Sequence, residues 1–307
     1  MASTVRVPLE VPIFGSDAGA LAARLGVSRL ELNRAGSYAQ GGTTPTLDEL
    51  TALLSSLSRD NRPTIRIMIR PRGPPSSPSP ATSPGRSQDH EEAQDFIYTP
   101  EEFTTMADSI TEFTSSGLLD ASKGDGFVFG ILRRRGLDSA LALDRERNIE
   151  LVTTVRNAGF KAVLHRAVDA LLSQRGSESG KEVVERVMEA VRECRFDGML
   201  TSGGLGSAVG NVVRLREVVS AAETERVEVI VGGGVRRGNL RVLIEGLGPG
   251  LAGRNGQAET RGVWFHSSCL KAGVDAQEVF DQEEARGLAD DLRALGLGSK
   301  EERVQGS

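Results

Sequence analysis

Short apolar runs alternate with longer amphipathic stretches along the chain, from about residue 9 to about residue 295. Runs such as 9–13 and 64–69 are too short for helices and carry apolar side chains at every second position. The stretches between the runs repeat apolar residues every three or four positions, as amphipathic helices do. Eight strand-like runs, each followed by a helix-like stretch, predict a protein of the α/β class.

Eight such alternations in about 300 residues predict a single-domain (β/α)8 barrel of the TIM type over residues 9–296. Local signals agree with this reading. Thr46 and Glu49 have the spacing of a capping box before a helix, and Gly26 follows a helical stretch as a C-terminal cap would. The alternative is a doubly wound open sheet. That fold usually has fewer strands and does not place charged residues inside so many of them.

Strand alternation predicts which side chains enter the barrel. In the third run Ile65 and Ile67 share the face that would pack under the helices, whereas Arg66 and Arg70 point inward. The same parity places these further residues inside: Glu10, Pro12, Glu31, Asn33, Lys161, His165 and Glu228. Buried charges persist when they are paired, so we expect a compensated ionic network. Such a network either serves a site or merely fills the barrel in place of branched apolar layers.

Two segments break the alternation. Residues 73–94 are rich in Pro and Ser and lack the apolar residues needed to offset the entropy of ordering, which predicts a disordered insertion after the third strand. Residues 298–307 are polar and are expected to form a flexible tail.

Composition narrows the class of protein. A formal charge of −5 gives no electrostatic footprint for nucleic acid or for an anionic membrane. Only two cysteines, Cys194 and Cys269, argue against a disulfide framework and fit a reducing compartment. The amino-terminal residues lack the apolar region of a signal peptide, and no run approaches eighteen apolar residues. These features predict a cytoplasmic location.

Residues at the carboxyl ends of the strands supply the candidate catalytic groups, since barrel enzymes place their sites there. His165 is a candidate general base or metal ligand, and Asp169 is placed to orient it. Glu31 or Glu10 is a candidate acid–base partner for His165. A histidine at such a position is also commonly a hydrogen-bonded wall residue, and this alternative stays open.

Other residues at these strand ends suit an anion. Arg70 and Arg72 offer two guanidinium forks that match a carboxylate or a phosphate. Barrels often bind phosphate on backbone N–H groups after the seventh and eighth strands, where Gly233 and Gly234 lie. The full candidate set is Arg70, Arg72, Thr201, Ser202, Gly233, Gly234 and Ser267. The glycine run is equally suited to a tight turn without a ligand.

Six motifs occur in a characteristic order: GGTTPT (41–46), IRPRG (69–73), LHRAVD (164–169), LTSGG (200–204), VGGGV (231–235) and FHSS (265–268). Together they resemble the CutC copper-homeostasis family, in the form of a fungal or other eukaryotic member with a Pro/Ser-rich insertion. The family's step after its RPRGG motif matches Asp95, Phe96 and Tyr98, beyond the insertion. The resemblance covers about residues 9–270. It implies a (β/α)8 barrel with a role in intracellular copper homeostasis.

Copper is therefore the cofactor that the resemblance implies, but the sequence supports it poorly. Copper proposals for the family centre on cysteines in its first two strands, and this chain has Pro12 and Asn33 at those positions. Neither side chain is the soft ligand that Cu(I) prefers. His266 and Cys269, three residues apart, form the remaining weak candidate for a metal site.

Three functions follow as hypotheses. The first is the role in intracellular copper homeostasis that the resemblance implies, although the residues give direct copper binding by this chain poor support. The second is a barrel enzyme acting on a small anionic or phosphorylated metabolite at the mouth. The third is an interaction scaffold that uses the insertion as a docking segment. A small anionic ligand and a second copy of the chain, packed through outer helices, are the expected partners. No sequence feature identifies a reaction, so whether the protein is an enzyme stays open.

Overall fold

Eight parallel strands close into a barrel in the computed structural model of the chain, with neighbours in the order β1-β10-β9-β8-β7-β4-β3-β2. The barrel strands are β1 (Val7–Ile13), β2 (Val27–Leu32), β3 (Thr64–Met68), β4 (Gly126–Phe129), β7 (Lys161–Leu164), β8 (Gly198–Thr201), β9 (Glu228–Val231) and β10 (Val263–His266). This closed sheet confirms the predicted (β/α)8 fold.

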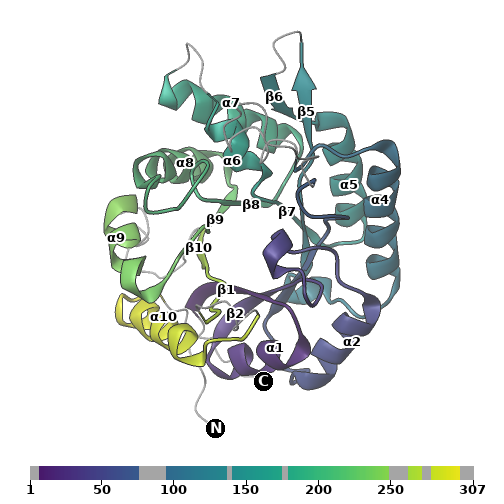
Figure 1. Ribbon diagram of the computed structural model, residues 1–307, viewed down its shortest axis with the longest axis vertical. Coiled ribbons are helices and arrows are strands. Elements are labelled where there is room, and N and C mark those ends of the chain that lie inside the picture. The colour runs from purple at the N-terminus through teal and green to yellow at the C-terminus, as the bar shows by residue number, and fades with distance from the viewer. Residues whose placement is uncertain are drawn as a thin grey trace, which may run out of the picture.

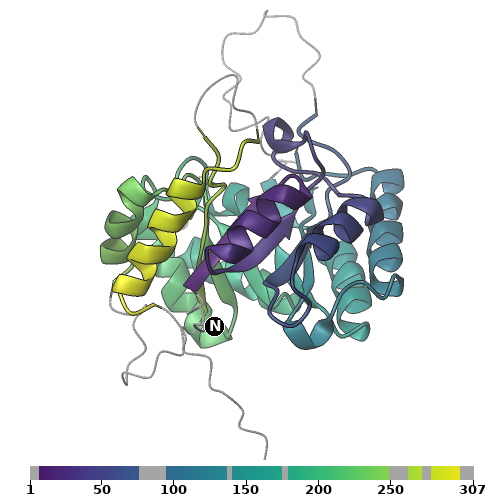
Figure 2. The same ribbon diagram turned by 90° about the horizontal axis from the view of Figure 1, so that it is seen from below.

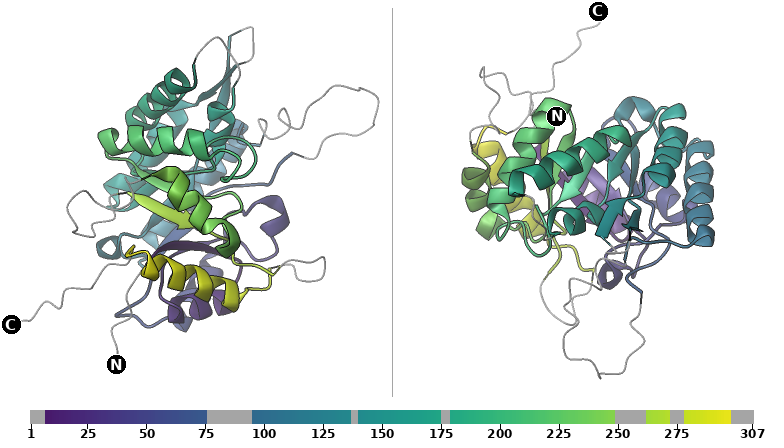
Figure 3. Two further views of the ribbon diagram at one scale, coloured as in Figure 1. Left: turned by 90° about the vertical axis from the view of Figure 1, so that its left-hand side faces the viewer. Right: turned by 90° about the horizontal axis from the view of Figure 1, so that it is seen from above.

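Helices surround the strands as an outer ring (Figure 1). They are α1 (Ser16–Arg24), α2 (Leu47–Ser56), α4 (Pro100–Ser115), α5 (Arg145–Asn157), α6 (Ala167–Leu172), α7 (Gly180–Glu193), α8 (Val212–Glu225), α9 (Arg237–Leu247) and α10 (Gln282–Ala294). Short 3-10 turns lie at η1 (Tyr38–Gln40) and η2 (Ala121–Lys123). Figure 2 shows α10, α1 and α2 side by side, and the left view of Figure 3 shows α8 and α9 continuing the layer beside α10.

The structure describes residues 7–75, 95–136, 140–174, 179–248, 262–271 and 278–297. Most of the expected insertion at 73–94 and the whole expected tail at 298–307 lie outside the described residues. No helix within the described ranges combines the length and apolar character needed to span a membrane.

Two elements were not predicted from the sequence. An antiparallel hairpin of β5 (Leu132–Arg135) and β6 (Ala140–Leu143) follows β4, and α6 precedes α7 within one βα unit. The hairpin stands outside the barrel sheet, and its three arginines are exposed, so it lacks the apolar alternation that marks the barrel strands. By contrast, Thr46 and Glu49 form the predicted capping box at the start of α2.

The outward strand faces form the main core. Ile65, Ile67 and Ile69 are fully buried in one apolar cluster with residues from the surrounding helices, as the alternation predicted. The inward faces form a second cluster, which consists of Met68, Val128, Val163, Leu200 and Ile230 with Trp264 packed against it. Because Met68 lies between Arg66 and Arg70 on its strand, this apolar belt separates charged side chains on its two sides.

The predicted ionic network is present, but its principal cation differs from those expected. Arg29 on β2 contacts Glu10 at 3.2 Å and Glu228 at 2.7 Å, and its guanidinium carbon lies 3.8 Å from the centre of the Trp264 ring. Lys161, expected inside, is instead half exposed at the amino end of β7 and pairs with Asp197. The Lys161 ammonium group reaches Asp197, which immediately precedes β8, instead of entering the barrel.

Candidate functional site at the barrel mouth

A cavity of about 400 Å³ opens at the carboxyl ends of the barrel strands. Pro12, Glu31, Asn33, His165 and His266 line it, and each stands at or just after the end of its strand. Further lining residues come from the loops after β3, β7, β8, β9 and β10. The cavity is therefore where the sequence placed the candidate site.

Glu10 and His266 meet because β1 and β10 pair in register, with Glu10 opposite His266. Nδ1 of His266 lies 2.8 Å from Oε1 of Glu10, and Arg29 donates to the other oxygen of that carboxylate. Burial alone would raise the pKa of Glu10, but the His266 hydrogen bond and the Arg29 charge outweigh it and lower this pKa to about 2. Burial would also lower the pKa of His266, but the Glu31 and Glu10 carboxylates raise it.

Glu31 is the second acid of the mouth, and its two oxygens differ. Asn33 donates from Nδ2 to Oε1 at 3.1 Å, whereas Oε2 is buried without a hydrogen-bond partner in the described structure. Burial raises the pKa of this carboxyl group, with His266 acting in the opposite direction. The Asn33 amide is itself confined, because a side chain at Gly42 would collide with it and Gly42 adopts a left-handed backbone with φ of 85°.

His165 lies on the opposite wall of the cavity at the end of β7. Its Nδ1 is buried and has no hydrogen-bond partner among the residues that the structure describes, and its ring packs against Phe96 at 5.4 Å between centres. Burial and the charges of Arg70 and Arg166 hold the pKa of His165 well below 6.5, so the imidazole is neutral at pH 7. His165 therefore presents an unengaged nitrogen to the cavity wall.

The sequence predicted that Asp169 orients His165, but the Asp169 carboxylate binds other groups. Its carboxylate accepts from the Thr201 hydroxyl at 2.5 Å, from the Ser202 hydroxyl at 2.8 Å and from Arg166 at 2.9 Å. Residues at the end of β8 and in the loop after it therefore occupy the Asp169 carboxylate. Thr201 and Ser202 were expected to bind an anion, but their hydroxyl groups donate to Asp169. Ser267 likewise donates to the Val235 carbonyl at 2.8 Å.

The Arg70 and Arg72 forks are also occupied by the protein. Arg70 donates two 2.7 Å bonds to Asp95 and two more to the carbonyls of Gln40 and Gly42. Arg72 bonds Glu102 and three backbone carbonyls and does not line the cavity. These two arginines hold η1 and the segment around Asp95 in place, so their guanidinium groups have a structural role.

Two cationic residues that the sequence did not single out reach the cavity instead. Arg166 follows β7 and donates to Asp169 and Ser202, and Arg236 caps α9 and donates to Ser268 at 3.0 Å. Both are only partly buried, and both line the cavity. Gly233 and Gly234, with φ of 88° and 83°, line it beside Arg236 as expected. The position of Arg236 after the VGGGV motif was the signal that could have identified it.

Cys269 does not line the cavity that His266 lines. It is fully buried, burial raises its thiol pKa to about 12, and it lies outside the cavity lining. Cys194 is buried at the end of α7 at the opposite end of the barrel. In the described part of the chain, the residues that gather with metal-ligand spacing are Glu10, Glu31 and His266. His266 therefore gathers with two carboxylates, a set of nitrogen and oxygen donors.

Together these groups define a (β/α)8 barrel whose mouth carries an acid–base cluster on β1, β2 and β10 and two arginines that follow β7 and β9. The CutC family model matches residues 90–250, more than half of the chain, and the chain belongs to the CutC family. This match confirms the resemblance to the CutC family, and it includes the motifs at 164–169, 200–204 and 231–235.

Curated relatives agree with that assignment. A protein of Agrobacterium fabrum described as a family protein CutC is 29% identical over 245 residues, which cover 78% of this chain and 76% of the relative. Copper homeostasis protein cutC homologs of mouse and human are each 26% identical over 240 residues, covering 78% of this chain and 70% of each relative.

Solved structures support the fold alone. Deoxyribose phosphate aldolase from Aeropyrum pernix matches with a TM-score of 0.50 at 10% identity, over 94% of this chain and 90% of the other. Ribulose-1,5-bisphosphate carboxylase/oxygenase from Pyrococcus horikoshii matches with a TM-score of 0.52 at 13% identity, over 94% of this chain and 58% of the other.

The residues at the mouth do not fit Cu(I), the metal that the family name implies. Pro12 and Asn33, at the positions of the family's proposed cysteine ligands, line the cavity and supply no sulfur. Both cysteines of the chain are buried away from it. Cu(I) prefers thiolate and thioether ligands, so the donor set around this cavity is of the wrong kind.

Proposed function

We propose that this chain takes part in copper homeostasis, as the names of its mouse and human relatives describe for those proteins, without holding Cu(I) on cysteine ligands. The family membership supports the role, and the replacement of thiolate donors by Pro12 and Asn33 at the mouth supports the restriction. The free, buried cysteines fit a reducing compartment, and we place the protein in the cytoplasm. We also assign it to the eukaryotic branch of the family, on the basis of its Pro/Ser-rich segment.

A complementation experiment tests this proposal. Host cells that lack the gene are scored for copper tolerance and total copper, then supplied with the wild-type chain or a Cys194→Ser/Cys269→Ser double variant. We expect the deletion to change copper tolerance and both forms to restore it equally. Unchanged tolerance and copper content in the deletion strain would refute the role. Failure of a folded double variant would refute the restriction.

A second candidate function is a barrel enzyme for a small anionic metabolite. Arg166 and Arg236 flank the cavity together with the Gly233–Gly234 turn, which presents backbone groups suited to a carboxylate or a phosphate. The pKa of His165 is lowered and that of the Glu10-bound His266 is raised, so one imidazole favours the neutral form and the other the protonated form. Acid–base chemistry requires such a pair of a proton acceptor and a proton donor. The cavity volume of about 400 Å³ lies within the range of small-molecule sites.

Ligand-dependent melting distinguishes this candidate. The full chain is heated with a panel of phosphate esters and small dicarboxylates, since a ligand that binds the folded state raises the melting temperature. We expect at least one class to stabilise the protein in a concentration-dependent way. If no compound of either class shifts the melting temperature, the enzyme hypothesis loses its substrate class.

A further inference from the structure

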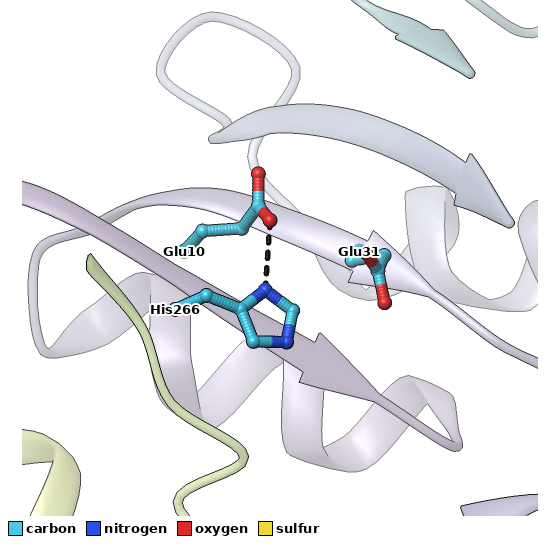
Figure 4. A group of neighbouring side chains, drawn as sticks. All are labelled: Glu10, Glu31 and His266. Carbon is cyan, nitrogen blue, oxygen red and sulfur yellow. Dashed lines mark hydrogen bonds and ion pairs between the residues drawn. The ribbon is translucent and has the colours of Figure 1, made fainter. Parts of the chain in front are cut away.

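Three potential metal-ligating side chains converge at the barrel mouth from β1, β2 and β10. One donor atom each from Glu10, Glu31 and His266 lies within 4.8 Å of the other two. Figure 4 shows the Glu10 carboxylate over one ring nitrogen of His266, while the Glu31 carboxylate lies apart from both and makes no bond to either. Strand pairing fixes this arrangement, because Glu10 is in register with His266 and Pro12 with Glu31.

Glu31 carries an independent sign of a missing ligand. The residue is only 3% exposed, and its Oε2 has no hydrogen-bond partner in the described structure, although it lines the cavity. An unpaired buried carboxylate oxygen is costly unless a cation or a donor meets it. Asn33 holds the other oxygen through Nδ2, which fixes the carboxylate and leaves Oε2 available.

The local charge points in the same direction. Glu10 and Glu228 lie near Arg29 and Arg66, whereas the charged groups that act on Glu31 are His266 and Glu10. Arg29 is shared by Glu10 and Glu228, and Arg66 donates to a backbone carbonyl rather than to an acid. Glu31 therefore has no cationic side chain of its own among the hydrogen-bonded partners in the described structure.

Glu10 and His266 have the geometry of a positioned metal ligand. When the Nδ1 of His266 donates its proton to Glu10, the second ring nitrogen keeps its lone pair, and His266 lines the cavity. A carboxylate that holds a histidine in this way commonly fixes the tautomer that binds a metal. Arg29 anchors Glu10 from behind at 3.2 Å.

We propose that Glu31 and His266 bind a divalent transition-metal cation, with Glu10 orienting the His266 imidazole and with Zn²⁺ as the probe, in place of a Cu(I) site. Imidazole and carboxylate donors suit Zn²⁺ and related divalent ions, whereas the site contains no thiolate. The remaining coordination positions face the cavity, where water or an anionic ligand completes them. This site does not depend on the copper role proposed above.

Calorimetric titration of Zn²⁺ into the reduced, metal-stripped full chain tests the site. We expect one Zn²⁺ per chain, weaker Mn²⁺ binding in accordance with the Irving–Williams order, and an increase in melting temperature with Zn²⁺. Zn²⁺ binding should persist in the Cys194→Ser/Cys269→Ser variant. Absence of binding in the wild-type chain, or its loss in that variant, would overturn the proposal.

Variants of the cluster locate the ion. Glu31→Gln and His266→Gln should abolish stoichiometric binding, and Glu10→Gln should weaken it about 10–100-fold, as loss of a histidine-orienting carboxylate does. Glu228→Gln is the matched control, because Glu228 also pairs with Arg29 but lies outside the cluster. It should bind Zn²⁺ as the wild type does. Equal affinity in wild type and folded Glu31→Gln would place the ion elsewhere and refute the site.

X-ray absorption of the wild-type Zn²⁺ complex keeps the test decisive if a variant fails to fold. We expect only nitrogen and oxygen neighbours at about 2.0–2.2 Å, including a histidine signature. A sulfur shell at about 2.3 Å would contradict the proposal.

Discussion

Arg29 and Glu228 lie 199 positions apart in the sequence and face each other inside the barrel, joined by two hydrogen bonds of 2.7 and 2.9 Å. The same guanidinium group reaches Glu10 and stacks on Trp264. One cation from β2 therefore links β1, β9 and β10, the strands that complete the barrel. The position of Glu10, and with it that of His266, depends on this contact.

Removal of Arg29 should therefore destabilise the protein strongly. Arg29→Met keeps a long, unbranched side chain but leaves Glu10 and Glu228 without their cation. We expect this loss to lower the free energy of unfolding by about 3–5 kcal/mol. Urea denaturation measures this cost. Lys161→Met is the control, because the Lys161–Asp197 pair is exposed and should contribute no more than about 1 kcal/mol. Equal losses in the two variants would contradict the account.

His165 should make stability depend on pH in the acidic range. Its folded-state pKa lies well below 6.5, so the unfolded chain binds a proton there before the folded chain does. Stability should fall as pH decreases below about 6.5, with a contribution of up to about 1.4 kcal/mol per pH unit from this residue. Unfolding free energies of wild type and His165→Gln between pH 7 and pH 5 provide the measurement. A difference between the two curves that does not change with pH would contradict the burial of a neutral imidazole.

The arginines of the mouth should separate into structural and ligand-binding groups. Arg70→Gln breaks the buried pair with Asp95, and we expect a loss of about 3–5 kcal/mol in unfolding free energy. Arg236→Gln removes only bonds to two serine hydroxyls from a partly exposed side chain, so its stability cost should be below about 1 kcal/mol. It should nevertheless abolish any anion-dependent rise in melting temperature. Retention of that rise in Arg236→Gln would exclude Arg236 from the anion site.

Neither cysteine should react readily in the folded protein. Burial raises the thiol pKa of Cys194 and of Cys269 to about 12, and the thiolate is the reactive form. A thiol reagent at pH 8 should therefore modify the native chain far more slowly than the urea-unfolded chain, which should yield two thiols. Rapid modification of one thiol in the native state, assigned with Cys269→Ser, would show that a cysteine is accessible to solvent and metals.

The sequence predicts the barrel and the orientation of its strands well, because these follow from a period of two. The isoleucines of β3 lie on the outward face, and Glu31 and Glu10 lie on the inward faces, where Glu10 contacts Arg29 and His266. Arg29 lies two positions before Glu31 on β2, so strand alternation also places it inside the barrel, although the sequence analysis did not select it. Lys161 shows the limit of parity, which cannot say how deep a side chain lies.

The partners of the site residues were not predictable in the same way. Glu10 and His266 meet only because the last strand pairs with the first, a contact across 256 positions that local pattern does not encode. The sequence indicates a ligand-binding fork at Arg70 because it does not reveal the acceptors of this side chain. These acceptors include the backbone carbonyl of Gln40 in η1 and the carboxylate of Asp95, which lies beyond the insertion. Hydrogen-bond saturation of this kind depends on the folded loops and not on residue type.

If the barrel mouth of this CutC-family chain carries nitrogen and oxygen donors in place of thiolates, the purified chain should not retain Cu(I). The reduced full-length protein is loaded with Cu(I), passed over a competing Cu(I) chelator and analysed for bound metal. The account predicts no copper above background, and the same result for Cys269→Ser. One equivalent of retained Cu(I) in the wild type, lost in Cys269→Ser, would contradict it.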